Sequence, residues 1–260
     1  MFDFNKLAIQ RVKISMSLLE IQNVSKHFGG ITAVDHCSFE ISEDEGIVGL
    51  MGPNGAGKTT LFNIITGFLR PNEGSITYKD KRIDNLQPFE IVKRGLVRSF
   101  QITRNLPDLT VLENMCIQSR EHNLNSLLKP AIAKDEERRA KELLEFVDLT
   151  HLVNEKSRNL SFGQQKLLEF TSALMLSPDT VLLDEPAGGV NPTLMGKIKD
   201  YILKLQKEHG INFIIIEHEI DLLMEICSSI VALAQGSVLI KGSPAEVQQN
   251  DQVLEAYLGG

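Results

Sequence analysis

Alternating hydrophobic and polar positions mark three short stretches in the first third of the chain. They cover residues 18–25 (LLEIQNVS), 37–42 (CSFEIS) and 75–80 (SITYKD), and the turn-forming residues PNEG at 71–74 precede the third. Side chains of a strand point alternately to its two faces, so this period of two is typical of half-buried strands. The N-terminal third is therefore predicted to be rich in short strands.

Unbroken apolar runs appear further along, and helical patterns lie between them. The runs are 46–52 (GIVGLMG), 180–185 (TVLLDE) and 211–218 (INFIIIEH), whereas 59–68, 164–175 and 193–208 carry helical spacing. Strands that are apolar throughout and alternate with helices are typical of a mainly parallel sheet covered on both faces. Two final strands, 228–235 and 237–242, meet at a glycine turn and precede a C-terminal helix.

The sequence pattern changes between the alternating stretch at 75–80 and the apolar run at 180–185. From residue 88 to about 160 the pattern is mostly helical, and 133–149 (AKDEERRAKELLEFVDL) is a charged amphipathic stretch with opposite charges four residues apart. We predict a helical subdomain inserted there into one α/β domain that covers residues 18–260. Residues 1–17 are expected to form a flexible N-terminal extension.

Composition narrows the class of protein. With a net charge of −7 the sequence shows no basic stripe that could neutralise phosphate backbones, so no nucleic-acid partner is expected, while a local basic patch stays open. The three cysteines are far apart and predict buried thiols. No apolar run approaches the roughly 20 residues of a membrane helix. Residues 1–17 lack the apolar core of a signal peptide, so a cytoplasmic location is predicted.

The loop after the first apolar run carries the clearest chemistry. GPNGAGKT matches G-x-x-x-x-G-K-[ST] and lies between a predicted strand and a predicted helix, as a phosphate-binding P-loop requires. Its glycines allow several N–H groups to face one anion, and the helix N-terminus adds positive potential. Lys58 is predicted to bind the β- and γ-phosphates of ATP, and the Thr59 hydroxyl to ligate Mg²⁺. The predicted ATP-binding residues are Gly52, Pro53, Asn54, Gly55, Ala56, Gly57, Lys58, Thr59 and Thr60.

Two adjacent carboxylates end the second apolar run, at Asp184 and Glu185. Buried charges are costly unless they meet a cation or take part in a reaction. Asp184 is therefore predicted to face Mg²⁺, and Glu185 to polarise the water that attacks the γ-phosphate. The alternative, a strand end that merely carries acids, is disfavoured by the P-loop upstream.

With these elements in place, the chain resembles the ATP-binding-cassette (ABC) family. LSFGQQ at 160–165 resembles the signature sequence of that family, and it precedes the Asp-Glu strand in the family's order. The resemblance implies that Ser161, Gly163 and Gln164, at a helix N-terminus, form a second anion site for nucleotide. Alone, a serine before a helix would be read as an N-cap.

Smaller motifs match the same family one by one. Gln101, in VRSFQ, resembles the Q-loop glutamine that senses Mg²⁺ and the γ-phosphate, which implies both a catalytic and a metal-binding role. His218 resembles the catalytic switch histidine, and Phe28 the aromatic residue that stacks on adenine. AGGVNP at 187–192 resembles the D-loop, which crosses between two subunits. Phe162 replaces the glycine that is common in the signature.

The resemblance implies a fold and an activity. The fold is α/β: a P-loop NTPase core with a mainly parallel sheet, an N-terminal antiparallel β subdomain and an inserted helical subdomain. The activity is ATP hydrolysis coupled to transport, with ATP and Mg²⁺ as cofactors. The chain looks most like the ATPase subunits of importers of branched-chain or polar amino acids, on the strength of FGGITAVD, VRSFQITRNLPDLTVLEN and the ending GSPAEVQQNDQVLEAYLG.

The implied partners are a second ABC ATPase, identical or related, and integral membrane permeases, with a solute-binding protein acting indirectly. Such a chain is peripheral on the inner face of the cell membrane. Urea or amide importers and lipopolysaccharide exporters use similar subunits, so these cargos stay open. A soluble ABC ATPase is a further alternative, as is a regulatory cassette without activity. A P-loop kinase or GTPase would explain neither the signature nor His218.

Overall fold

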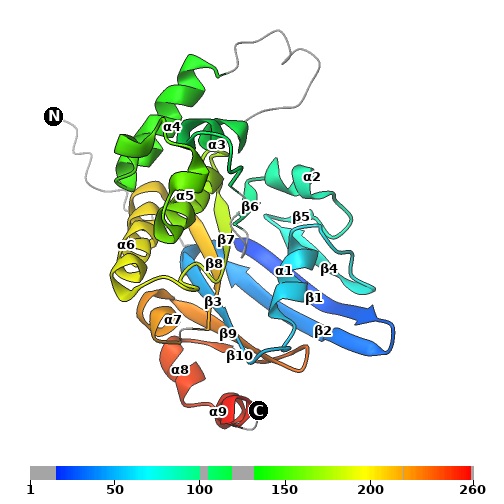
Figure 1. The fold of residues 1–260 in the computed structure, drawn as a ribbon. Coiled ribbons are helices and arrows are strands. Elements are labelled where there is room, and N and C mark those ends of the chain that lie inside the picture. Colours follow the sequence, from blue (N-terminus) through cyan, green and yellow to red (C-terminus); the bar gives the residue numbers. More distant parts are fainter. Residues whose placement is uncertain (1–15, 100–104, 119–131, 219, 259–260) are drawn as a thin grey trace, which may run out of the picture.

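The computed structural model describes residues 16–99, 105–118, 132–218 and 220–258 (Figure 1). Gln101 therefore lies outside the described residues, and so do all but the last two residues of the predicted N-terminal extension, 1–17. No helix in the described ranges has the length and apolar character needed to cross a bilayer.

The described strands form two sheets. A four-stranded antiparallel sheet has the order β2-β1-β4-β5, and a six-stranded sheet has the order β10-β9-β3-β8-β7-β6. In the latter all neighbours are parallel except β10 and β9. The strands are β1 (Ser17–Phe28), β2 (Ile31–Ser42), β3 (Ile47–Met51), β4 (Glu73–Tyr78), β5 (Lys81–Arg82), β6 (Leu96–Arg98), β7 (Thr180–Asp184), β8 (Asn212–Ile216), β9 (Ser229–Ala234) and β10 (Ser237–Gly242). The predicted fold class, α/β with an antiparallel N-terminal sheet, is confirmed.

Helices surround the six-stranded sheet (Figure 1). They are α1 (Lys58–Ile65), α2 (Pro88–Val92), α3 (Val111–Gln118), α4 (Lys134–Phe146), α5 (Phe162–Leu174), α6 (Pro192–His209), α7 (Ile220–Ile226), α8 (Pro244–Gln248) and α9 (Asp251–Leu258). Short 3₁₀ turns lie at Glu43–Glu45, Thr150–Leu152 and Ser157–Asn159.

The unbroken apolar strands are explained by two hydrophobic cores, one on each face of the six-stranded sheet. Along β7, Val181 and Leu183 pack in the core shared with α3 to α6, whereas Leu182 packs in the core shared with α1 and the antiparallel sheet. Along β8, Ile215 packs in the first of these cores and Ile214 in the second. Because both faces of each strand are covered, neither face can be polar.

The helical part gathers α3, α4 and α5 on one side of the molecule, where Met115, Leu144 and Leu168 are buried in one cluster (Figure 1). β6, however, is the edge strand of the six-stranded sheet and pairs with β7. The predicted helical range of about 88–160 therefore includes a strand of the core sheet, and this subdomain boundary stays a prediction.

Candidate nucleotide site

The predicted phosphate loop joins the end of β3 to the start of α1, and its backbone leaves no room for side chains at two glycines. Gly52 and Gly57 have φ of +154° and +97°. A Cβ atom would strike the carbonyl oxygen of Leu233 at Gly52, and that of Ala33 at Gly57. These positions need glycine both for conformation and for close approach.

Lys58 is folded into this loop. Its side chain donates hydrogen bonds to the carbonyl oxygens of Gly52, at 2.6 Å, and Pro53, at 3.0 Å, and the residue is 6% exposed. Burial lowers the pKa of Lys58 below its ordinary value, and the negative charges of Glu185 and Asp184 oppose that shift. The predicted phosphate cation and the two strand-end carboxylates are thus within electrostatic reach of one another.

The remaining loop residues line the start of α1. Asn54, Gly55 and Thr59 are exposed and Thr60 is half-buried, while Ala56 is buried and packs in the core. Gly57 is the N-cap of α1, so no side chain covers the free N–H groups of the first turn. This arrangement favours a bound anion.

Asp184 and Glu185 follow one another at the carboxyl end of β7 but face different surroundings. The Asp184 side chain is fully buried and forms an ion pair with Arg98, 2.6 Å from Oδ2. Its Oδ1 atom is buried and has no hydrogen-bond partner among the described residues. Glu185 has φ of +52°, rare for a residue with a side chain, and its N–H donates to Ile216 of β8 at 2.9 Å.

His218 meets Glu185 across the ends of β7 and β8. Its Nε2 atom lies 2.8 Å from Oε1 of Glu185, and their side chains are 44% and 20% exposed. The carboxylate is therefore oriented by a neighbour while still open to solvent. Such a pair can hold a carboxylate in position to accept a proton from water.

Glu217 belongs to this cluster, although the sequence did not single it out. The residue is 2% exposed, and its carboxylate accepts hydrogen bonds from the N–H groups of Ala187, at 2.7 Å, and His218, at 3.1 Å. It thus joins the predicted D-loop to the segment carrying His218. The sequence did offer one signal for Glu217, because its carboxylate follows directly after an apolar strand. The family motif at this place, however, is matched by the next residue, His218.

The predicted signature begins α5 and contacts the D-loop segment. Ser161 accepts from the N–H of Gln164 at 3.3 Å, and the Gln164 side chain accepts from the N–H of Ser161 at 2.9 Å. A Cβ at Gly163 would lie 2.6 Å from Leu194, and one at Gly189 would lie 3.3 Å from the Phe162 ring. Ser161 is therefore the N-cap of α5, the alternative noted from the sequence, and Ser161 and Phe162 are both exposed.

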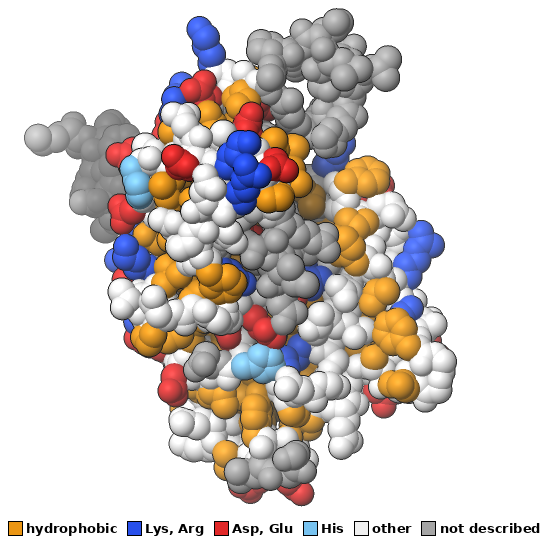
Figure 2. All heavy atoms as spheres, in the orientation of Figure 1, with side chains coloured by type: hydrophobic (Ala, Val, Ile, Leu, Met, Phe, Trp, Pro, Cys, Tyr) orange, Lys and Arg blue, Asp and Glu red, His pale blue; other side chains and the backbone are white. Residues whose placement is uncertain are grey.

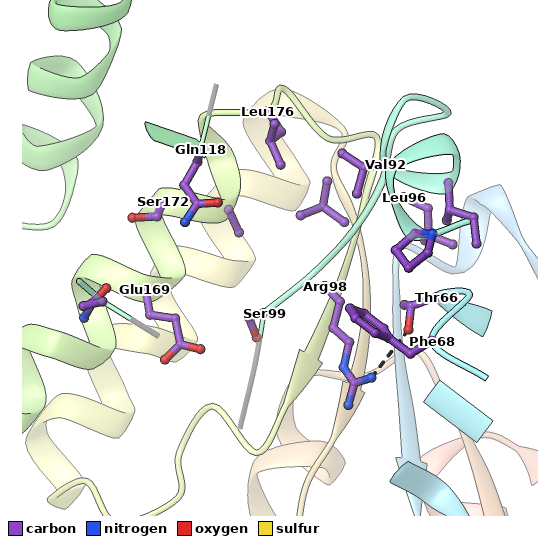
Figure 3. A pocket seen from close by; sticks show the side chains of 15 residues that line it. Thr66, Phe68, Val92, Leu96, Arg98, Ser99, Gln118, Glu169, Ser172 and Leu176 are labelled. Carbon is purple, nitrogen blue, oxygen red and sulfur yellow. Dashed lines mark hydrogen bonds between the residues drawn. The ribbon is translucent and has the colours of Figure 1, made fainter. Parts of the chain in front are cut away.

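Phe28 and Gln101 are the remaining residues of the predicted site. Phe28 ends β1, is 46% exposed, and has Lys26 Nζ 5.5 Å from its ring centre. An exposed ring is available for stacking. Gln101 lies outside the described residues. Ser99, at the end of the described segment before it, lines a pocket of about 330 Å³ between α2 and α5, whose other lining residues include Thr66, Phe68, Arg98, Glu169 and Leu176 (Figure 3).

Comparison with known proteins identifies the class. The family model described as "ABC transporter" matches residues 34–188, more than half of the chain. A second model, described as "Branched-chain amino acid ATP-binding cassette transporter", matches residues 241–260. The chain therefore belongs to the ABC transporter family. Its characteristic activity, the hydrolysis of bound ATP, is the activity of this chain.

Individual relatives are similar over nearly their whole length. The chain is 37% identical to the high-affinity branched-chain amino acid transport ATP-binding protein BraF of Pseudomonas aeruginosa, covering 95% of this chain and 99% of that protein. An ATP-binding cassette of an ABC transporter in its ADP conformation superposes with a TM-score of 0.82, at 38% identity and covering 95% and 100% of the two chains. A dimeric bacterial ABC transporter cassette gives a TM-score of 0.75 at 27% identity, covering 87% and 99%.

Proposed function

We propose that this chain is the ATPase subunit of a branched-chain amino-acid importer. The observation that carries the proposal is the convergence of Lys58, Asp184 and the Glu185–His218 pair beside an open phosphate loop. The cargo class is supported by the C-terminal match at residues 241–260 and by the name of the relative from Pseudomonas aeruginosa.

ATP binds through the backbone of the phosphate loop. Lys58 leaves its two carbonyl partners and donates to the β- and γ-phosphates, whose negative charge compensates the ammonium group for the hydration that burial removes. Phe28 stacks on the adenine ring. The rest of this binding set is Gly52, Pro53, Asn54, Gly55, Ala56, Gly57, Thr59 and Thr60.

Mg²⁺ fits the donors present at this site. The buried Oδ1 atom of Asp184, which has no hydrogen-bond partner among the described residues, is a hard oxygen donor of the kind that Mg²⁺ prefers. The Thr59 hydroxyl and Gln101 complete the proposed set. The bound cation would neutralise charge on the β- and γ-phosphates.

Hydrolysis is assigned to three side chains. Glu185 accepts a proton from the attacking water, and its open face and its hydrogen bond to His218 suit that role. His218 orients Glu185 through Nε2, and it is proposed to contact the γ-phosphate once ATP is bound. Gln101 is proposed to position the same water.

Two copies, or this chain and a related ATPase, are proposed to enclose each nucleotide. Ser161, Gly163 and Gln164 of one subunit would cover the γ-phosphate bound to the other. The exposed turn at the start of α5 and the similarity to a dimeric cassette support this arrangement. ATP binding would then close the pair and hydrolysis would open it.

The membrane permease is proposed to dock a short helix in the pocket between α2 and α5. Apolar side chains such as Phe68, Leu96 and Leu176 line much of the pocket (Figure 3). Exposed Phe68 and Phe89 add apolar surface on its α2 side, and hydrophobic side chains gather over that region in Figure 2. The chain is thus proposed to be cytoplasmic and peripheral on the inner membrane face, with a solute-binding protein as an indirect partner that delivers cargo to the permease.

Uptake by cells that lack this chain tests the cargo. Radiolabelled leucine, valine and isoleucine are supplied at concentrations where high-affinity uptake dominates, with urea and glutamate in parallel. We expect deletion to abolish branched-chain uptake, and the wild-type chain but not Glu185→Gln to restore it. Normal uptake of branched-chain amino acids together with lost uptake of another solute would contradict the assignment. Co-purification with an affinity-tagged chain identifies the permease independently.

A further inference from the structure

Arg98 is a buried cation at the end of the edge strand β6. Its side chain is 8% exposed, and one guanidinium nitrogen lies 2.6 Å from Oδ2 of Asp184, whose side chain is fully buried. In the parallel register Arg98 lies opposite Leu182, two residues before Asp184 on the same face of β7. The two charges therefore meet on the α1 face of the sheet, the face of the phosphate loop.

A second guanidinium nitrogen ties Arg98 to α1. It donates to Asn63 Oδ1 at 2.6 Å and approaches Thr66 Oγ1 at 3.5 Å (Figure 3), and the guanidinium carbon lies 5.7 Å from the centre of the Phe62 ring. A guanidinium group is planar and presents its donors at fixed angles. It can therefore fix the orientation of Asp184 relative to α1, the helix that carries Lys58 and Thr59.

We propose that Arg98 is a positioning residue for the Mg²⁺ ligand Asp184. Arg98 binds Oδ2 and so holds the carboxylate with Oδ1, the oxygen without a hydrogen-bond partner among the described residues, available for the cation. Groups that hydrogen-bond to a metal ligand orient it, and their loss typically weakens metal binding about 10–100-fold. The inference rests on the proposed role of Asp184 as a Mg²⁺ ligand, and it names Arg98 as the side chain that orients this ligand.

Arg98 also lines the pocket assigned above to the permease, together with Thr66, Phe68 and Ser99 (Figure 3). One side chain thus contacts both that pocket and the carboxylate proposed to hold Mg²⁺. A partner that shifts the end of β6 would move Arg98 and, through it, Asp184. This gives the pocket a direct physical connection to the cation site.

Nucleotide binding measured with and without Mg²⁺ tests the proposal without relying on hydrolysis. Fluorescent ATP is titrated into the full chain in EDTA and then across a range of Mg²⁺ concentrations, for the wild type, Arg98→Ala and Arg98→Lys. We expect both variants to need at least about tenfold more Mg²⁺ for half-maximal enhancement of binding. Affinity in EDTA should stay within about twofold of the wild type, and Arg98→Lys, which keeps the charge, should be the milder change.

Arg82→Ala is the matched control, because Arg82 pairs with Asp84, another buried carboxylate, 2.8 Å away on the antiparallel sheet. It should lower the melting temperature but leave the Mg²⁺ dependence unchanged. An unaltered Mg²⁺ dependence in Arg98→Lys, or an equal loss of affinity with and without Mg²⁺, would overturn the proposal. If Arg98→Ala does not fold, Arg98→Lys decides the outcome. Were Asp184→Asn to leave the Mg²⁺ dependence unchanged, the proposed metal site itself would fail.

Discussion

Nε2 of His218 lies 2.8 Å from Oε1 of Glu185, across the carboxyl ends of two adjacent parallel strands. The chain reaches this geometry by placing Glu185 in a left-handed backbone conformation at the end of β7. A side chain in that conformation costs free energy, so the surrounding structure must hold it, and such strain is typical of functional sites. The contact therefore indicates that Glu185 and His218 act together in catalysis.

His218→Ala should lower kcat for ATP hydrolysis about tenfold or more and leave ATP affinity nearly unchanged. The substitution removes the hydrogen bond that orients Glu185 but touches no residue of the phosphate loop. Steady-state turnover and equilibrium binding measure the two effects. His209→Ala, in the last turn of α6, is the control. Normal turnover in His218→Ala would remove the orienting role.

Lys58→Ala should weaken ATP binding by about 10–100-fold. Hydrogen bonds to charged groups contribute roughly 1.5–3 kcal/mol, and each 1.4 kcal/mol is a factor of ten in affinity. Isothermal titration calorimetry measures the change. Lys79→Ala also removes a lysine, one paired with Asp179 at 2.8 Å, and should bind ATP normally. Equal affinities for the two variants would contradict the placement of the phosphates.

Glu217→Gln should destabilise the fold by about 1–3 kcal/mol and reduce hydrolysis. Both carboxylate oxygens accept backbone hydrogen bonds, and an amide can supply only one oxygen, so one buried N–H loses its partner. Urea denaturation and ATP turnover give the two readouts. Glu225→Gln, on an exposed pair with Lys199, is the comparison. If Glu217→Gln unfolds at the same urea concentration as wild type, Glu217 does not hold the D-loop as described.

The Glu185→Gln variant should dimerise with ATP and stay monomeric with ADP. Blocked hydrolysis preserves the closed state, in which Ser161 and Gly163 of one chain cover the nucleotide of the other. Ser161→Ala in the same background should weaken the dimer. Light scattering well above nucleotide saturation measures the mass. Monomers in both nucleotide states would count against a homodimer, although a related ATPase could still be the partner in the cell.

Much of the fold could be predicted because strong local patterns agree with it. β3, β7 and β8 were visible as apolar runs, and each ends where the sequence changes to glycine or to charge. β6 was missed, because three residues are too few for a pattern and because Arg98 interrupts the apolar character. The charge of Arg98 is balanced by Asp184, 86 residues later. Pairing over such a distance leaves no local signal.

The candidate site was predicted as a set of motifs and not as a set of contacts. The motifs placed Lys58 between a strand and a helix, and Asp184, Glu185 and, by resemblance, His218 at strand ends, and the structure brings these residues together. It did not reveal that Glu217 accepts the N–H of Ala187, because that contact depends on the path of the D-loop. Backbone partners of a buried carboxylate follow from tertiary structure.

Turnover of Glu185→Gln tests most directly the claim that this chain hydrolyses ATP with Glu185 as the base. The substitution keeps the shape of the side chain and removes its charge and basicity. General-base assistance is worth about 10²–10⁴ in rate, so the purified variant should bind ATP as tightly as wild type and hydrolyse it at about 1% of the normal rate or less. Near-normal hydrolysis would contradict the assignment.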